Sequence, residues 1–133
     1  MKNILIPVCL FTVISCAKKD DINQTFTGDL PIVSTTTPVS IAAGQDIVSN
    51  IRCELVFVSG AVYFKGFDIK ATGDKQFSIS ARALYKDWNT QVGTPVMWTL
   101  DTIANIKTTT AGKYILNFYN SKKLFKSDTI QVN

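Results

Sequence analysis

Hydrophobic and polar residues alternate along most of residues 38–133, in short runs that turn-forming residues separate. The clearest run is 47–58, in which Cys53 lies on the same face as Ile51 and Leu55. Strict alternation is typical of a half-buried β-strand, whereas the apolar residues of an amphipathic helix recur about every 3.6 residues. No stretch keeps the helical period over a useful length, so we expect an all-β fold with little helix.

Seven such runs are the predicted strands. They cover residues 39–42, 47–58, 62–71, 76–85, 96–100 with a continuation toward 106, 113–119 and 124–132. In the third run the apolar phase shifts at Gly66, which predicts a β-bulge. In the fifth run we expect Val96, Trp98 and Leu100 to face inward. Short strands at this spacing predict an antiparallel β-sandwich of the immunoglobulin-like kind, with about seven strands.

The segment TAGKYIL at residues 110–116 resembles the tyrosine corner of immunoglobulin-like domains, because Tyr114 follows Gly112 at the start of the penultimate strand. Leu116 then stands where antibody domains place their second disulfide cysteine. The resemblance implies a sandwich in which packing around Cys53 replaces the disulfide.

A separate apolar run of about eleven residues occupies 4–14, directly after Lys2. A helix needs roughly 20 apolar residues to cross a bilayer, so this run is too short for a membrane span. A basic residue, a short apolar run and a small residue such as Ser15 are typical of a secretory leader that is cleaved off. We therefore predict a signal peptide over residues 1–15.

The tetrad Val13-Ile14-Ser15-Cys16 resembles the lipobox of bacterial lipoproteins. The resemblance implies cleavage before Cys16 and a diacylglycerol on its thiol. Two or three acyl chains are enough for stable attachment to a membrane. The alternative is an ordinary secretory leader, with Cys16 as an unmodified thiol.

The cluster Lys19-Asp20-Asp21 resembles the export signal of Bacteroidota lipoproteins that reach the outside of the outer membrane. It implies a lipid-anchored, surface-exposed protein of the outer membrane, and the alternative is a solvated spacer that faces the periplasm. The chain then stays rich in Thr, Ser, Asn, Gly and Pro as far as residue 37. We therefore predict a lipid anchor and flexible tether over residues 16–37 and one domain over 38–133.

The formal net charge is +4, and the basic residues are scattered apart from a loose group of Lys122, Lys123 and Lys126. Nucleic-acid-binding proteins cluster such residues on one face. We therefore interpret the charge as an aid to solubility and expect no nucleic-acid partner. The lysine group could attract acidic glycans or lipid headgroups, but a solvated turn and strand edge is the preferred interpretation.

Histidine is absent, which excludes Ser-His-Asp and Cys-His triads and the usual zinc ligand sets. Without a histidine to activate it, Cys53 is predicted to be a small core residue and not a nucleophile. We assign no catalytic residue, metal ligand or cofactor.

Carboxylates are the remaining candidates for chemistry. Two of them could serve a hydrolase, and the candidates are Asp68, Asp74, Asp87, Asp101 and Asp128. Asp87 and Asn89 could also contribute to a calcium site. Because no pair is placed together by the sequence, structural roles are the preferred interpretation.

The loop at residues 85–90 is the candidate binding segment, with Trp88 as its main residue and Tyr85 as the companion. A tryptophan among polar residues offers a flat surface to a sugar ring or a protein, and the alternative is that it caps the sandwich. The sequence therefore predicts a non-enzymatic binding module for an envelope protein or glycan. The alternatives are an accessory subunit of an outer-membrane complex, pairing through the edge of strand 124–132, and a hydrolase that uses two aspartates.

Overall fold

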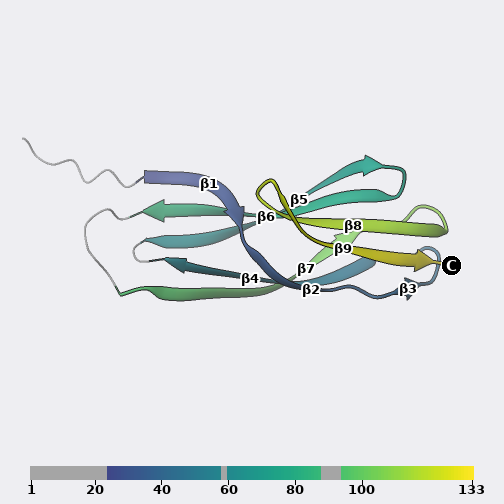
Figure 1. Cartoon of the computed structure of the whole chain (residues 1–133), viewed down its shortest axis with the longest axis horizontal. Helices are drawn as coiled ribbons and strands as arrows, with labels where there is room; N and C mark the ends of the chain where they lie inside the picture. Colours follow the sequence, from purple (N-terminus) through teal and green to yellow (C-terminus); the bar gives the residue numbers. More distant parts are fainter. Residues whose placement is uncertain (1–23, 58–59, 88–93) are drawn as a thin grey trace, which may run out of the picture.

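The computed structural model describes residues 24–57, 60–87 and 94–133. In these ranges the chain forms nine β-strands and no helix. The strands make two sheets that pack against each other around a common apolar core (Figure 1). The all-β sandwich is therefore confirmed, with two strands more than the sequence predicts.

The first sheet has the order β1-β6-β8-β9-β3, with β5 also paired to β6, and the second sheet has the order β2-β4-β7. The strands are β1 Gln24–Leu30, β2 Ile32–Thr36, β3 Ser40–Ile41, β4 Ile47–Phe57, β5 Ala61–Gly73, β6 Gln76–Asp87, β7 Val96–Ile106, β8 Gly112–Asn120 and β9 Lys123–Val132. The C-terminus lies beside β3 at one end of the sandwich (Figure 1).

The core lies between the sheets and takes its largest side chains from both of them. These are Tyr114, Phe118, Leu30, Ile32, Ile47, Ile51, Ile79, Leu116, Ile130 and Val132. The alternation in β4 and β8 therefore predicts the buried face correctly. In β7, Trp98 and Leu100 pack against the core as expected, but Val96 is 54% exposed because it lies at the end of the sandwich.

Residues 24–36 are strands and not part of a flexible tether. The strand β1 pairs along β6, and after Pro31 the chain crosses to the second sheet, where β2 pairs with β4. Only Leu30, Ile32 and Thr35 of this segment are buried, so its sequence lacks a sustained apolar pattern. Backbone pairing with two longer strands, which the local sequence does not encode, makes these residues part of the domain.

Two strand pairs are parallel, so the sandwich is not purely antiparallel as the sequence predicts. The short β3 runs parallel to the end of β9, and β8 runs parallel to the first part of β6. A parallel pair needs a crossover connection. Here β7 provides it, because the chain leaves β6, passes through the second sheet and returns to the first as β8.

The predicted bulge at Gly66 is confirmed by a register shift between Phe64 and Gly66 in the pairing of β5 with β6. Gly66 has a φ of 103°, a backbone conformation that residues with a Cβ rarely adopt. The extra residue brings Phe64 and Phe67 to the same side of the strand, where both pack against the core. The bulge is thus the reason why the apolar phase shifts.

The hydrogen bonds of a tyrosine corner are present at Tyr114. Its Oη donates to the carbonyl oxygen of Thr110 at 3.0 Å and accepts from the backbone N–H of Thr109 at 3.2 Å. The ring is buried and stacks on Phe77 at a centroid distance of 6.4 Å. The residue therefore fastens the loop that enters β8 to the core, as the resemblance implies.

Cys53 is free and fully buried on the inner face of β4. Burial raises the pKa of its thiol to about 11, so the thiol is protonated at neutral pH. Because the thiolate is the reactive form of cysteine, this group is not poised for nucleophilic attack. The prediction that Cys53 is a small core residue is confirmed.

Candidate functional site

The outer face of the first sheet carries a polar hollow at a gap between two strand ends. The strand β5 occupies one edge of β6 along nearly its whole length, so β1 and β8 share the other edge. On that edge β1 pairs with residues 81–87 and β8 pairs with 76–79. Ser80 pairs with neither β1 nor β8 on this edge, and it is one of the residues that line the hollow.

The hollow has a volume of about 370 Å³, which is within the range of small-molecule sites. Charged and hydroxyl-bearing side chains make up most of its lining. The lining residues are Asp29, Asp68, Lys70, Ser78, Ile79, Ser80, Arg82, Tyr119, Ser121 and Lys122. Four strands and the turn between β8 and β9 thus contribute polar groups to one place.

Two ion pairs join four of the charged groups that line the hollow. Arg82 Nη1 pairs with Asp29 Oδ1, and Lys70 Nζ lies 2.7 Å from Asp68 Oδ2. The Asp29 side chain is only 19% exposed, so the first pair is partly desolvated and better fixed than a surface pair. Asp29 and Arg82 are also direct neighbours in the pairing of β1 with β6.

The side chain of Asn120 fixes one wall of the hollow. Its Oδ1 accepts from the backbone N–H of Ile32 at 2.8 Å, and its Nδ2 donates to the carbonyl oxygen of Ile32 at 3.0 Å. This contact ties the end of β8 to the place where the chain crosses from β1 to β2. The turn that follows Asn120 carries Ser121 and Lys122, two of the lining residues.

The chemistry of the hollow is that of a hydroxyl-binding surface. Carboxylate oxygens accept hydrogen bonds, ammonium and guanidinium groups donate them, and serine and tyrosine hydroxyls do both. Tyr119 also brings an aromatic ring next to these groups. Several donors and acceptors directed at one small volume suit a ligand with many hydroxyl groups, such as a sugar.

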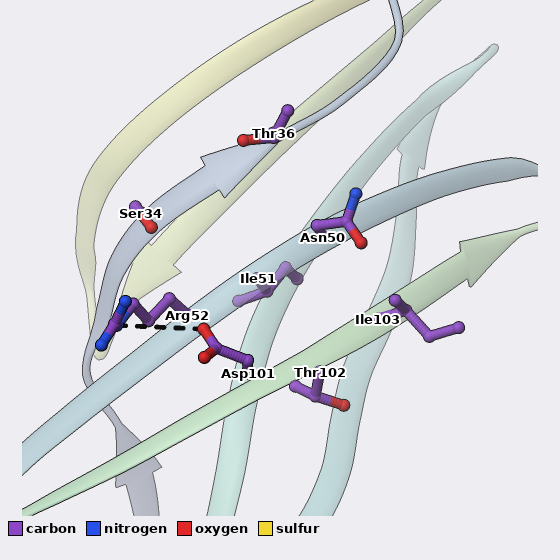
Figure 2. A pocket seen from close by; sticks show the side chains of 8 residues that line it. All are labelled: Ser34, Thr36, Asn50, Ile51, Arg52, Asp101, Thr102 and Ile103. Carbon is purple, nitrogen blue, oxygen red and sulfur yellow. Dashed lines mark ion pairs between the residues drawn. The ribbon is translucent and has the colours of Figure 1, made fainter.

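A second hollow, of about 350 Å³, lies on the outer face of β2, β4 and β7. Figure 2 shows its side chains spread along the three strands, with Arg52 directed toward Asp101. Arg52 Nε lies 3.8 Å from Asp101 Oδ1 and 3.1 Å from Glu54 Oε1. Neither pair includes a group as buried as the Asp29 side chain of the first hollow, and exposed pairs contribute little. We therefore place the candidate site in the first hollow.

Of the two predicted binding residues, Tyr85 has a structural role. Its ring stacks on Phe26 at a centroid distance of 5.0 Å and covers Gly28, and its Oη donates to the carbonyl oxygen of Asp29 at 2.7 Å. Burial, with a smaller effect of the Asp29 carboxylate, raises the pKa of Tyr85. Tyr85 therefore fastens β1 to β6, behind the sheet that bears the hollow.

The other predicted site residues lie outside the described part of the chain. These are Trp88, the lipidation residue Cys16 and the export-signal residues Lys19, Asp20 and Asp21. The same holds for Asn89 and for the side chain of Asp87, the proposed calcium ligands. Their roles stay predictions.

The structure brings two carboxylates into one hollow, and only one of them is a candidate from the sequence. Asp68 is among the candidates, but Asp29 is not, because it lies in residues 16–37, which the composition predicts to be a tether. Asp101 instead faces Arg52 on the second sheet, and Asp128 pairs with Lys126 at 2.9 Å. The signal that could have found the site is the polar row Ser78, Ser80 and Arg82, which alternates with the inward residues of β6.

Within residues 24–57, 60–87 and 94–133, no group of three or more His, Cys, Asp or Glu side chains could hold a metal ion. The same residues include no helix long and apolar enough to cross a membrane. Comparisons with protein-family models, curated proteins and solved structures found no match to this chain. The geometry of the hollow and the lipobox-like tetrad at residues 13–16 are therefore the features that bear on function.

Proposed function

We propose that this chain is a lipid-anchored protein of the cell envelope whose β-sandwich is a non-enzymatic binding module. Its ligand is a glycan, bound in the hollow around Ser80. The lipobox that ends at Cys16 supports the location. The observation that carries the binding role is the convergence of two ion pairs, three serines, a tyrosine and Lys122 on about 370 Å³ of outer-face volume.

A binding role is favoured over hydrolysis by the state of the two carboxylates. A glycosidase needs one carboxyl group that donates a proton and another that acts as nucleophile or base. Here Asp29 accepts from Arg82 and Asp68 accepts from Lys70, so both are engaged as acceptors in ion pairs. Fixed acceptors of this kind orient ligand hydroxyl groups without reacting with them.

Removal of Lys122 or of the Tyr119 ring is expected to weaken glycan binding about tenfold each, because each loss removes roughly 1.4 kcal/mol of contact energy. Cells that display the full chain are first screened with an array of neutral and acidic oligosaccharides. The best ligand is then titrated against Lys122→Ala and Tyr119→Ala. Both residues line the hollow.

Two matched variants control this titration. Lys113→Ala removes an exposed lysine of β8 and Tyr63→Ala removes a half-exposed tyrosine of β5, and neither residue lines the hollow. Both are expected to bind like the unchanged chain. Equal losses in all four variants, or no oligosaccharide bound above background, would show that the hollow is not a glycan site.

Substitution of Cys16 by serine is expected to abolish lipid attachment, because the serine hydroxyl does not replace the thiolate as acceptor of the diacylglycerol. Metabolic labelling with a radioactive fatty acid and fractionation of membranes measure this result. Cys9→Ser, in the predicted leader, is the control and should leave labelling unchanged. Fatty-acid label on the Cys16→Ser chain would refute the proposed anchor.

A further inference from the structure

The strand β7 is a long free edge of the second sheet. It pairs with β4 over eleven residues, from Val96 to Ile106, and within the described ranges no other strand pairs with it. The pairing with β4 has no register shift. An edge strand leaves every second backbone N–H and C=O group without a partner in the sheet, so a straight edge is a template for another strand.

The β5 and β2 edges carry features that hinder such pairing, and the β1 edge, at seven residues, is shorter than the eleven residues of β7. The β5 edge has a bulge at Gly66 and exposed lysines at 65 and 70. The β2 edge is five residues long and has a register shift at its start. Bulges, short strands and lysines are the common means by which proteins protect their edges. The strand β7 has none of the three.

The edge of β9 predicted from the sequence is partly covered. The parallel strand β3 pairs with residues 131–132. Further along, Lys126 Nζ donates to the carbonyl oxygen of Thr35 at 3.1 Å, and Thr35 Oγ1 donates to Asp128 at 3.3 Å. Lys126 and Asp128 therefore fasten β9 to β2 across the sandwich. The best edge for pairing is β7, not β9.

The outward side chains of β7 fit an antiparallel copy of the same strand. Met97 and Ile103 are 66% and 51% exposed, and Asp101 is the only charged residue of the strand. Figure 2 shows Asp101, Thr102 and Ile103 along β7 at the margin of the sheet, opposite β2. In a register centred on Leu100, each residue pairs with the residue that lies equally far from Leu100 on the other side. The pairs are Met97 with Ile103, Trp98 with Thr102, Thr99 with Asp101, and Leu100 with its own copy.

We infer that this protein forms a two-fold symmetric dimer through its β7 strands in that register. Exposed apolar side chains meet on both sides of the axis, and the Thr99 hydroxyl can donate to the Asp101 carboxylate of the other copy. The two Asp101 side chains do not stand opposite each other, so no like charges are paired. The second sheets of the two copies join into one continuous sheet of six strands, which is an isologous interface.

The dimer leaves the candidate glycan site free, because the hollow lies on the outer face of the first sheet. No residue of β7 lines the hollow. Two hollows in one dimer would bind a repetitive glycan more tightly than one hollow alone. The dimer itself does not depend on the proposed glycan function.

Charge substitutions at positions 97 and 103 test the register directly. The full chain, purified in a non-ionic detergent, is examined by sedimentation velocity over a wide range of concentrations. The unchanged chain is expected to dimerise. M97K/I103K places like charges opposite each other and should raise the dimer dissociation constant about tenfold or more. M97E/I103K places opposite charges together and should restore most of the dimer.

The matched control is Leu124→Lys, which adds a lysine at an exposed apolar residue of β9 and should leave the dimer intact. Circular dichroism confirms that each variant is folded. The inference is overturned if the unchanged chain is a monomer at every concentration. This result would also be seen if β7 bound a strand of another protein instead of a second copy. The inference is also overturned if M97K/I103K does not weaken the dimer, or if M97E/I103K does not restore the dimer that M97K/I103K weakens.

Discussion

Substitution of Asn120 by alanine is expected to destabilise the domain by about 2–4 kcal/mol, because it leaves two buried backbone groups without partners and each costs about 1–3 kcal/mol. Both groups belong to Ile32, which is 1% exposed, and both are bound by the Asn120 amide at 2.8 and 3.0 Å. The methyl group of alanine has no donor or acceptor, so it replaces neither hydrogen bond. The free energy of unfolding is measured by guanidinium denaturation of residues 17–133.

Asn117 provides a matched control for this prediction. It lies on the same strand, but its side chain accepts a hydrogen bond from Ser127 Oγ at an exposed position. Asn117→Ala should cost less than about 1 kcal/mol, since water replaces the lost contact. If the two asparagine variants lose the same stability, then the contact between Asn120 and Ile32 does not fix the crossing from β1 to β2.

Tyr114→Phe is expected to cost about 2 kcal/mol, because it removes a buried hydroxyl group that takes part in several hydrogen bonds to the backbone. The hydroxyl donates to Thr110 and accepts from the N–H groups of Thr109 and Thr110. Phenylalanine keeps the ring stacked on Phe77, so the packing contribution stays almost unchanged. Guanidinium denaturation of residues 17–133 again measures the effect.

Tyr63→Phe is the control for the tyrosine corner. The Tyr63 side chain is 48% exposed, and its ring faces the Lys86 ammonium, a contact that phenylalanine preserves. Because the side chain is half exposed, removal of its hydroxyl group should change the free energy of unfolding by no more than about 0.5 kcal/mol. A Tyr114→Phe domain as stable as this control would mean that the corner contributes nothing to the fold.

The alternation of apolar and polar residues is enough to predict most of the strands. The runs at β4, β6 and β8 each have one buried face, and a side-chain period of two residues reports such a face directly. The phase shift at Gly66 likewise reports a bulge, because an inserted residue moves every later side chain to the other side. These features are local, so a single sequence contains them.

The first two strands escape this kind of analysis. In β1 and β2 the residues are mostly Thr, Ser, Gly and Asp, and few of them reach the core. Their strand conformation comes from hydrogen bonds to β6 and β4, whose paired residues lie 51 to 63 and 14 to 21 positions further along the chain. Asp29 is likewise far from Arg82 and Asp68 in the sequence, so no local pattern connects these residues.

What the sequence by itself determined is the fold class, the inward face of the main strands, the place of the bulge and the roles of Cys53 and Tyr114. The role of Tyr114 follows from the resemblance of residues 110–116 to a tyrosine corner, and the others follow from the burial of local side chains. The tertiary structure alone decided which strands share an edge. That choice placed β1 and β8 end to end along β6, which created the polar hollow around Ser80, and it left the outer edge of β7 without a partner strand in the described part of the chain. Strand order depends on pairing between distant backbone segments, and backbone groups are the same in every residue, so no local pattern reports it.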